Sequence, residues 1–182
     1  MPASPLSNGE RMKQHYIRAM DALHTMAMAI SGICLVVITL IIPWGVFTRY
    51  VLNSASSWPE PMAVLLMVWF SFMSAAVCYR ENLHIGVGIL PNALTGTRRL
   101  LLGLVVEGAM IGISLFMLHY GTKLVATTWY QVIADFPIIS TGVAYLPVPI
   151  GGAIVGLFVI ERIWTGRFFE SPFATEETTS LE

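Results

Sequence analysis

Four long stretches of the chain carry almost no charge. Residues 22–48, 61–79 and 136–160 contain no Asp, Glu, Lys or Arg, and residues 100–122 contain only Glu107. A helix that crosses a bilayer needs about 20 predominantly apolar residues, and each stretch offers nearly that number or more. The pattern therefore predicts an all-α integral membrane protein with four transmembrane helices, at about 22–48, 58–79, 100–123 and 140–163.

Composition supports this interpretation and narrows the class of protein. Of the 182 residues, 55% are hydrophobic and 12% are charged, and the mean hydropathy is +0.71. Four spans of about 20 residues leave roughly 100 residues for tails and loops, so six or more spans do not fit comfortably and most complete transporter folds are excluded. The net charge of −1, with no long basic run, argues against nucleic acid as a partner.

The chain is expected to have three parts. Residues 1–21 form a cytoplasmic tail, in which residues 12–21 lie along the membrane surface as an interfacial helix. Residues 22–164 form the membrane domain, and residues 165–182 form a second cytoplasmic tail that is rich in Ser, Thr and Glu and is expected to be disordered. The first apolar stretch is too long for the core of a signal peptide, so we expect an uncleaved N-terminus.

The basic residues predict the orientation of the four spans. Only Arg49 and Lys123 fall in the connections after the first and third spans, whereas eight basic residues fall on the other side. These eight are Arg11, Lys13, Arg18, Arg80, Arg98, Arg99, Arg162 and Arg167. Because an excess of Lys and Arg marks cytoplasmic segments, both termini are expected to be cytoplasmic.

Two connections carry further signals. Ser57-Trp58-Pro59-Glu60 has the Ser-x-x-Glu spacing of a capping box with Pro in the first turn, so a helix should begin near Trp58. The apolar run 124–134 is too short to span a membrane. It is either an interfacial segment or a continuation of a long, tilted third helix.

The polar residues within and beside the spans have several possible roles. Glu107 is the one carboxylate well inside a span, and a carboxylate there is costly unless it is paired or protonated. A polar contact within the bundle, a contact with a partner and ion coupling are the three interpretations. Arg49 and Glu60 are expected either to pair at the periplasmic surface or to be separately solvated.

Cofactor and exporter chemistry is not supported. The four histidines do not fall in pairs at one depth within the spans, which opposes haem ligation. Cys34 and Cys78 lack C-x-x-C spacing and are interpreted as buried thiols, so no metal or redox site is expected. A small multidrug exporter would need a carboxylate in the first span and a weak charge bias, and this sequence has neither.

The spans also lack a visible site for an anionic solute, because their middles contain only scattered Ser and Thr. Pro147 and Pro149 have no amide N–H, so the carbonyls of Val143 and Tyr145 lose their helical partners. One interpretation is a kink or a late start of the helix, and the other is that the free carbonyls bind a cation. Two Gly-x-x-x-Gly pairs are expected to permit close helix packing, within the bundle or with another chain. The pairs are Gly108 with Gly112 and Gly152 with Gly156.

An ordered set of short motifs resembles the small, DctQ-like membrane subunit of tripartite ATP-independent periplasmic (TRAP) transporters, over about residues 15–165. The motifs are Arg49-Tyr50-Val51-Leu52-Asn53, Trp58-Pro59-Glu60, a span ending in Arg80 followed by His84-Ile85, and Tyr145-Leu146-Pro147-Val148-Pro149-Ile150-Gly151. Pro61 and Gly88 stand where this family often has acidic residues.

The resemblance implies a non-enzymatic role in sodium-driven uptake of organic acids across a bacterial inner membrane. The expected partners are a large permease that contains the substrate path, a periplasmic solute-binding protein and the lipid bilayer. By the same resemblance, Arg49, Trp58, Glu60 and His84 are candidate partner-contact or structural residues. The alternative is a stand-alone four-helix membrane protein, either a redox subunit or a small exporter.

Overall fold

A computed structural model describes residues 8–54, 56–81, 97–133 and 136–165 of the chain. Four of its helices are long and apolar enough to cross a membrane, as the sequence predicted. His84, Gly88 and nearly all of the predicted C-terminal tail lie outside the described residues. The elements are α1 (Asn8–Tyr50), α2 (Pro59–Arg80), α4 (Thr97–Thr128), β1 (Val132–Ile133), β2 (Phe136–Ser140), α5 (Thr141–Tyr145) and α6 (Pro147–Thr165).

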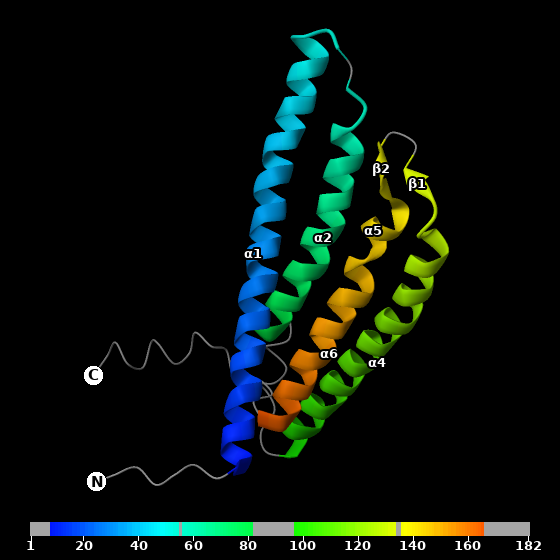
Figure 1. The fold of residues 1–182 in the computed structure, drawn as a ribbon. Helices are drawn as coiled ribbons and strands as arrows, with labels where there is room; N and C mark the ends of the chain where they lie inside the picture. The colour runs from blue at the N-terminus through cyan, green and yellow to red at the C-terminus, as the bar shows by residue number, and fades with distance from the viewer. Residues whose placement is uncertain (1–7, 55, 82–96, 134–135, 166–182) are drawn as a thin grey trace, which may run out of the picture.

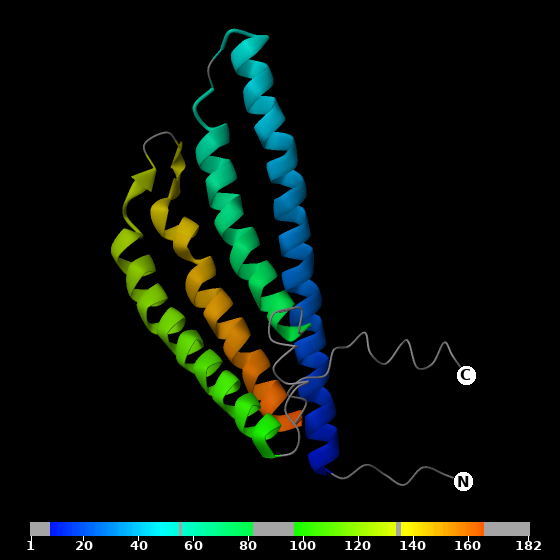
Figure 2. The same ribbon diagram turned by 180° about the vertical axis from the view of Figure 1, so that it is seen from behind.

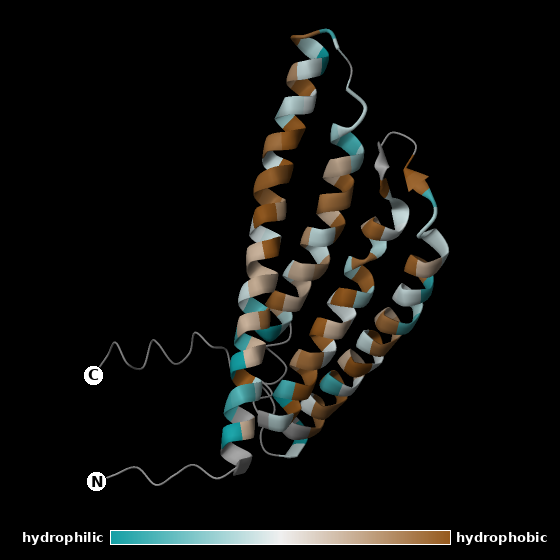
Figure 3. Cartoon of the chain, viewed as in Figure 1, coloured by the Kyte–Doolittle hydropathy of each residue, from teal (hydrophilic) through white to brown (hydrophobic). Residues whose placement is uncertain are grey.

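The long helices stand side by side in the order α1, α2, α6, α4 (Figures 1 and 2). Helix α1 packs chiefly against α2, α4 packs chiefly against α6, and α2 contacts α6 in the middle. The start of α1, the start of α4 and the end of α6 lie at the same end of the bundle along the helix axes. Charged residues gather there, among the teal bands in Figure 3, so we call it the charged end. The opposite end of the bundle holds Arg49 and Glu60 beside a surface groove that is described below, and we call it the groove end.

The buried core lies between the two central helices. Met73, Ala76 and Val77 of α2 pack with Phe158 and Val159 of α6. The edge helices α1 and α4 bury a smaller share of their residues, 17% of each span against 28% for α2 and 44% for the fourth span, and many of their large apolar side chains are exposed. Such exposure is acceptable in a bilayer, because lipid tails are as apolar as these side chains.

Helix α1 is continuous from Asn8 to Tyr50, so residues 12–21 belong to the same helix as the first span. At 1.5 Å per residue its 43 residues measure about 65 Å. Its first turns pack on the end of α6: the Tyr16 hydroxyl donates to the Leu157 carbonyl at 3.1 Å, and the Tyr16 and Trp164 rings lie 5.5 Å apart. The placement of this segment relative to a membrane surface stays a prediction.

Helix α2 begins at Pro59, next to the predicted start, but the predicted capping box is wrong. Trp58 is the N-cap residue, its backbone is helical, and its side chain makes no capping hydrogen bond. The Glu60 carboxylate instead pairs with Arg49. Pro59 is buried where a Cβ on Gly45 would lie 3.1 Å from its ring, so close packing against α1 positions the first turn of α2.

The third span runs on as a single helix to Thr128, in agreement with one of the two interpretations of residues 124–134. The chain then turns, and β1 pairs with β2 in a short antiparallel ladder that the sequence analysis missed. The Thr141 amide donates to the Gln131 carbonyl at 2.8 Å, which ties the end of this hairpin to the start of α5.

The fourth span is interrupted at Leu146, between α5 and α6. Pro147 has no amide to donate to the Val143 carbonyl, and this carbonyl accepts the Trp69 indole N–H of α2 at 3.3 Å instead. Because α5 already begins at Thr141, close to the predicted start of the span at about residue 140, the arrangement is a break within the span and not a late helix start. The freed carbonyl therefore serves as a link between α2 and α5 rather than as part of a cation site.

Gly152 and Gly156 of α6 face α4 at short range, whereas Gly108 and Gly112 of α4 are not closely packed. A Cβ on Gly152 would lie 2.8 Å from the Met117 Cβ and 3.2 Å from the Ser114 carbonyl, and one on Gly156 would lie 2.5 Å from the Ser114 hydroxyl. A Cβ on Gly108 or Gly112 would meet nothing within 4 Å among the described residues. Helix α4 thus approaches α6 through Ser114 and Gly121 instead.

Replacing Gly152 with Ala should destabilise the protein relative to Gly112→Ala by about 1–3 kcal/mol, because only the first added methyl group meets backbone and Cβ atoms of α4. Both changes gain the same helix propensity, so the pair isolates the packing effect. Denaturant unfolding of the isolated chain in detergent measures it. Equal unfolding free energies for the two variants would contradict the packing described here.

Candidate functional site

Charged side chains from α1, α2, α4 and α6 meet at the charged end of the bundle. Two arginines stand at the centre of this network, Arg80 near the end of α2 and Arg162 near the end of α6. Each arginine contacts side chains or backbone of two other helices.

Arg80 links α2 to α6 and to α1. Its Nε and Nη2 atoms donate to the two carboxylate oxygens of Glu161 at 3.0 and 2.9 Å, which is the bidentate geometry that arginine favours. The Nη2 atom also donates to the Asp21 carboxylate at 2.6 Å. The guanidinium carbon lies 5.2 Å from the centre of the Phe158 ring, so the cation also faces an aromatic side chain of the core.

Arg162 links α6 to α4 and to α2. Its Nη1 atom donates to Glu107 at 3.2 Å, and its Nη2 atom donates to the Tyr79 carbonyl at 2.9 Å. The Tyr79 hydroxyl donates to the second oxygen of Glu107, and the Tyr79 ring lies 4.6 Å beneath the guanidinium. Glu107, Arg162 and Tyr79 therefore form a closed triangle across three helices.

The environment of Glu107 explains how a carboxylate is accommodated within a span. The residue is only 2% exposed, and the Arg162 side chain is 11% exposed. A buried charge costs several kcal/mol unless an opposite charge and hydrogen bonds compensate for lost hydration, and both carboxylate oxygens of Glu107 have such partners. Of the three interpretations of Glu107, the polar contact within the bundle is present.

Sequence reasoning treated Arg80 and Arg162 only as markers of topology and did not assign roles to Asp21, Tyr79, Glu81 or Glu161. A signal was present: the second and fourth spans each end where an acidic and a basic residue are adjacent, at Arg80-Glu81 and at Glu161-Arg162. The Glu81 carboxylate accepts a hydrogen bond from Nε2–H of His24 of α1 at 3.0 Å. Opposite charges at one end of adjacent spans can pair across helices.

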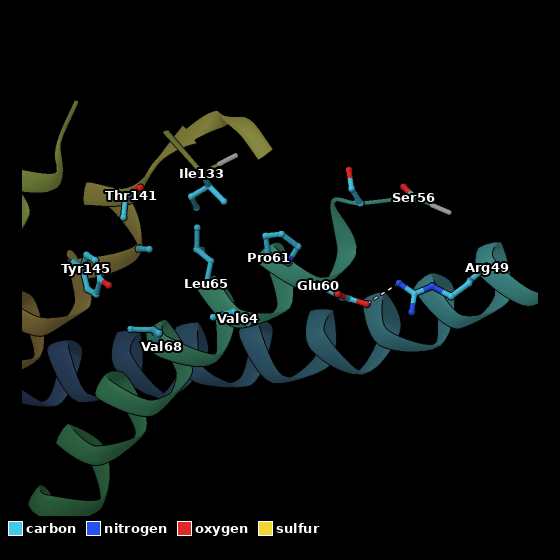
Figure 4. Close-up of a pocket in the computed structure, with 12 residues that line it drawn as sticks. Arg49, Ser56, Glu60, Pro61, Val64, Leu65, Val68, Ile133, Thr141 and Tyr145 are labelled. Atoms are coloured by element: carbon cyan, nitrogen blue, oxygen red, sulfur yellow. Dashed lines mark hydrogen bonds and ion pairs between the residues drawn. The ribbon is translucent and has the colours of Figure 1, made fainter. Parts of the chain in front are cut away.

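The groove end has a different character. The predicted pair forms there, with Arg49 Nη2 donating to the Glu60 carboxylate at 2.8 Å, but the two side chains are 52% and 75% exposed. Beside the pair lies a groove of about 570 Å³ between α2, β1 and α5 (Figure 4). Polar side chains line one part of it and apolar side chains line the rest.

The remaining candidates are placed as follows. Trp58 is half-buried at the start of α2, and its carbonyl accepts the Met62 amide at 3.2 Å. Cys34 is buried and Cys78 is half-buried, both as free thiols. Within the described ranges, no three His, Cys, Asp or Glu side chains gather in a way that could hold a metal ion.

Replacing Glu107 with Gln should lower the free energy of unfolding by about 3 kcal/mol or more, because Arg162 would face a neutral amide in a buried position. The same change at Glu60 should cost about 0–1 kcal/mol, since that pair is exposed. Denaturant unfolding in detergent compares the two variants. A loss at Glu60 as large as that at Glu107 would show that burial does not control the strength of these pairs.

Comparison with known proteins identifies the family. The family model for the DctQ component of tripartite ATP-independent periplasmic transporters matches residues 38–168, well over half of the chain. A Haemophilus influenzae protein whose name describes it as a TRAP transporter small permease is 24% identical over 87% of this chain and 94% of its own length. The sialic acid TRAP transporter small permease protein SiaQ of Vibrio cholerae is 25% identical over 68% of this chain and 71% of its own.

These matches favour a transporter subunit over a stand-alone redox protein or exporter. The family is not a family of enzymes. With four apolar helices, the chain is a multi-pass protein of the bacterial inner membrane. It belongs to the DctQ family of TRAP transporter small permease subunits.

Proposed function

We propose that this subunit is a scaffold: it holds a large permease fixed in the bilayer while the permease carries the substrate path in sodium-coupled uptake of organic acids. The observation that carries the proposal is the charged network. The arginines and carboxylates within the spans are engaged with one another across four helices, an arrangement that stabilises the bundle rather than gripping a charged solute.

The shape of the subunit supports the scaffold role. Four helices in a row present broad apolar faces, and α1 and α4 expose large side chains such as Val36, Leu40, Leu115 and Phe116. A large membrane partner can pack on such a face. TRAP small permease subunits work in a tripartite system with a large permease and a periplasmic binding protein, and we propose the same partners here.

Support for the substrate class comes from the name of the Vibrio cholerae relative. Sialic acid carries a carboxylate, so a related subunit serves an organic acid. We extend only the chemical class to this chain. The particular solute depends on proteins other than this subunit.

Arg49, Trp58 and Glu60, together with His84, remain candidates for partner contact. The first three lie at the groove end, and the Arg49 and Glu60 side chains are exposed enough to reach another molecule. By the distribution of basic residues, we propose that this end is periplasmic and that both termini are cytoplasmic.

Co-expression with a large TRAP permease from the same organism tests the scaffold role. An affinity tag on this subunit should recover the permease, and uptake of the organic acid should require both proteins. The isolated subunit should bind no organic acid in calorimetry, and binding by the isolated chain would refute the proposal. In the same assay, Glu107→Gln should reduce the amount of assembled complex while the sodium dependence of the remaining uptake is unchanged.

The orientation is tested by thiol labelling in a variant without Cys34 and Cys78. A membrane-impermeant maleimide added to intact cells should label Ser54→Cys, which lies between α1 and α2, and should not label Thr97→Cys at the start of α4. Both cysteines should react after the cells are opened. Labelling of Thr97→Cys alone in intact cells would reverse the proposed topology.

A further inference from the structure

We propose that the groove beside Arg49 and Glu60 binds a phospholipid whose head group carries a phosphate and a primary amine, as in phosphatidylethanolamine. Arg49 takes the phosphate, Glu60 takes the amine, and an acyl chain lies along the apolar wall formed by Val64, Val68 and Tyr145 (Figure 4). The inference depends on the membrane location of the chain and not on its role in transport.

The groove is graded from polar to apolar along α2. Glu60 lies in the first turn of the helix, and Val64 and Val68 follow four and eight residues later. At 1.5 Å per residue they lie about 6 and 12 Å deeper along the helix axis. Because α2 is a membrane span that begins at Pro59, the polar part lies near the membrane surface and the apolar part lies within the hydrocarbon.

The charges of the rim match those of a zwitterionic head group. A guanidinium fits a phosphate through two parallel hydrogen bonds, and an ammonium donates to a carboxylate. The Arg49–Glu60 contact joins one nitrogen to one oxygen, and its side chains are 52% and 75% exposed. An exposed pair is weak and opens at little cost. Arg49 can therefore leave Glu60 to bind the phosphate, and Glu60 can then bind the amine.

Other head groups match less well. The quaternary ammonium of phosphatidylcholine has no N–H to donate to Glu60. Phosphatidylglycerol has no cation for Glu60 and places a net negative charge near that carboxylate. Ser56, which also lines the groove, supplies a hydroxyl group on the side of Arg49 and Glu60, whereas Thr141 lies at the other end, beside Tyr145.

The wall and the size of the groove suit an acyl chain. Val64 is 63% exposed and Tyr145 is 37% exposed, so both present apolar surface to an occupant from the bilayer. The volume of about 570 Å³ falls within the range of about 300–1,000 Å³ that is common for small-molecule sites. A transmembrane helix of a partner would cover the apolar wall, but it would also need its own charged groups to meet Arg49 and Glu60. One phospholipid supplies the phosphate, the amine and the acyl chain together.

Lipid retention tests the proposal. The isolated chain is placed in nanodiscs with equal parts of phosphatidylethanolamine and phosphatidylcholine, extracted into detergent, and examined by native mass spectrometry. The wild type should retain phosphatidylethanolamine in preference to phosphatidylcholine. Arg49→Gln and Glu60→Gln should each reduce that retention about tenfold, as expected for loss of a charge-assisted hydrogen bond.

Lys123→Gln is the matched control, because Lys123 is an exposed cation on α4 that does not line the groove. It should leave retention unchanged. Val68→Trp, which fills the apolar wall, should reduce retention while leaving both rim charges in place. Pull-down of the permease by the same variants is measured separately, so that failure of lipid binding is distinguished from failure of the scaffold role.

Several results would overturn the inference. Equal retention of the two lipids by the wild type would exclude amine recognition by Glu60. Unchanged retention in both rim variants would exclude the groove as the site. Efficient cross-linking of Val64→Cys to the permease in the assembled complex, with no retained phospholipid, would assign the groove to the partner protein instead.

Discussion

The structure depends on two arginines that are neutralised between helices. In water, apolar faces drive helices together, but in a bilayer the lipid is as apolar as the helix surface, so association needs close packing and polar contacts. Arg80 and Arg162 supply the polar contacts, and between them they connect α2 and α6 to α1 and α4. Burial of these charges is tolerated because each carboxylate that approaches them is also hydrogen-bonded in the network.

The close packing is found in the interface between α4 and α6. Gly152 and Gly156 let α6 approach α4 closely, and the Ser114 hydroxyl donates to the Gly152 carbonyl at 2.7 Å. Contacts of this kind run from the charged end toward the groove end, where Gly121 meets Pro149. The α4–α6 pair is therefore closely packed along most of its length, which suits the scaffold role that we propose.

The two ends of the bundle differ in how their charges are used. At the charged end Arg80, Glu161, Arg162 and Glu107 are largely buried and engaged across helices, and Asp21 pairs with Arg80 from an exposed position. At the groove end one exposed pair lies beside an open, partly apolar groove. The first arrangement stabilises the subunit itself, and the second leaves charges accessible to another molecule. The charged end therefore has a structural role, and the groove end is the one that we propose for recognition of another molecule.

The sequence by itself determined the four spans, the start of α2 and the disturbance of the fourth span at its prolines, since charge-free length and proline depend only on local chemistry. It also offered the pairing of Arg49 with Glu60 as one of two interpretations, because a short connection separates them, and the structure contains the pair. The sequence could not determine that Glu107 pairs with Arg162, that Gly112 stays open while Gly152 is packed, or that β1 pairs with β2. These features depend on how each helix is rotated about its axis and on which helices are neighbours. In a membrane the lipid-facing and protein-facing sides are equally apolar, so the rotation leaves no periodic pattern in the sequence, and only the tertiary structure decided it.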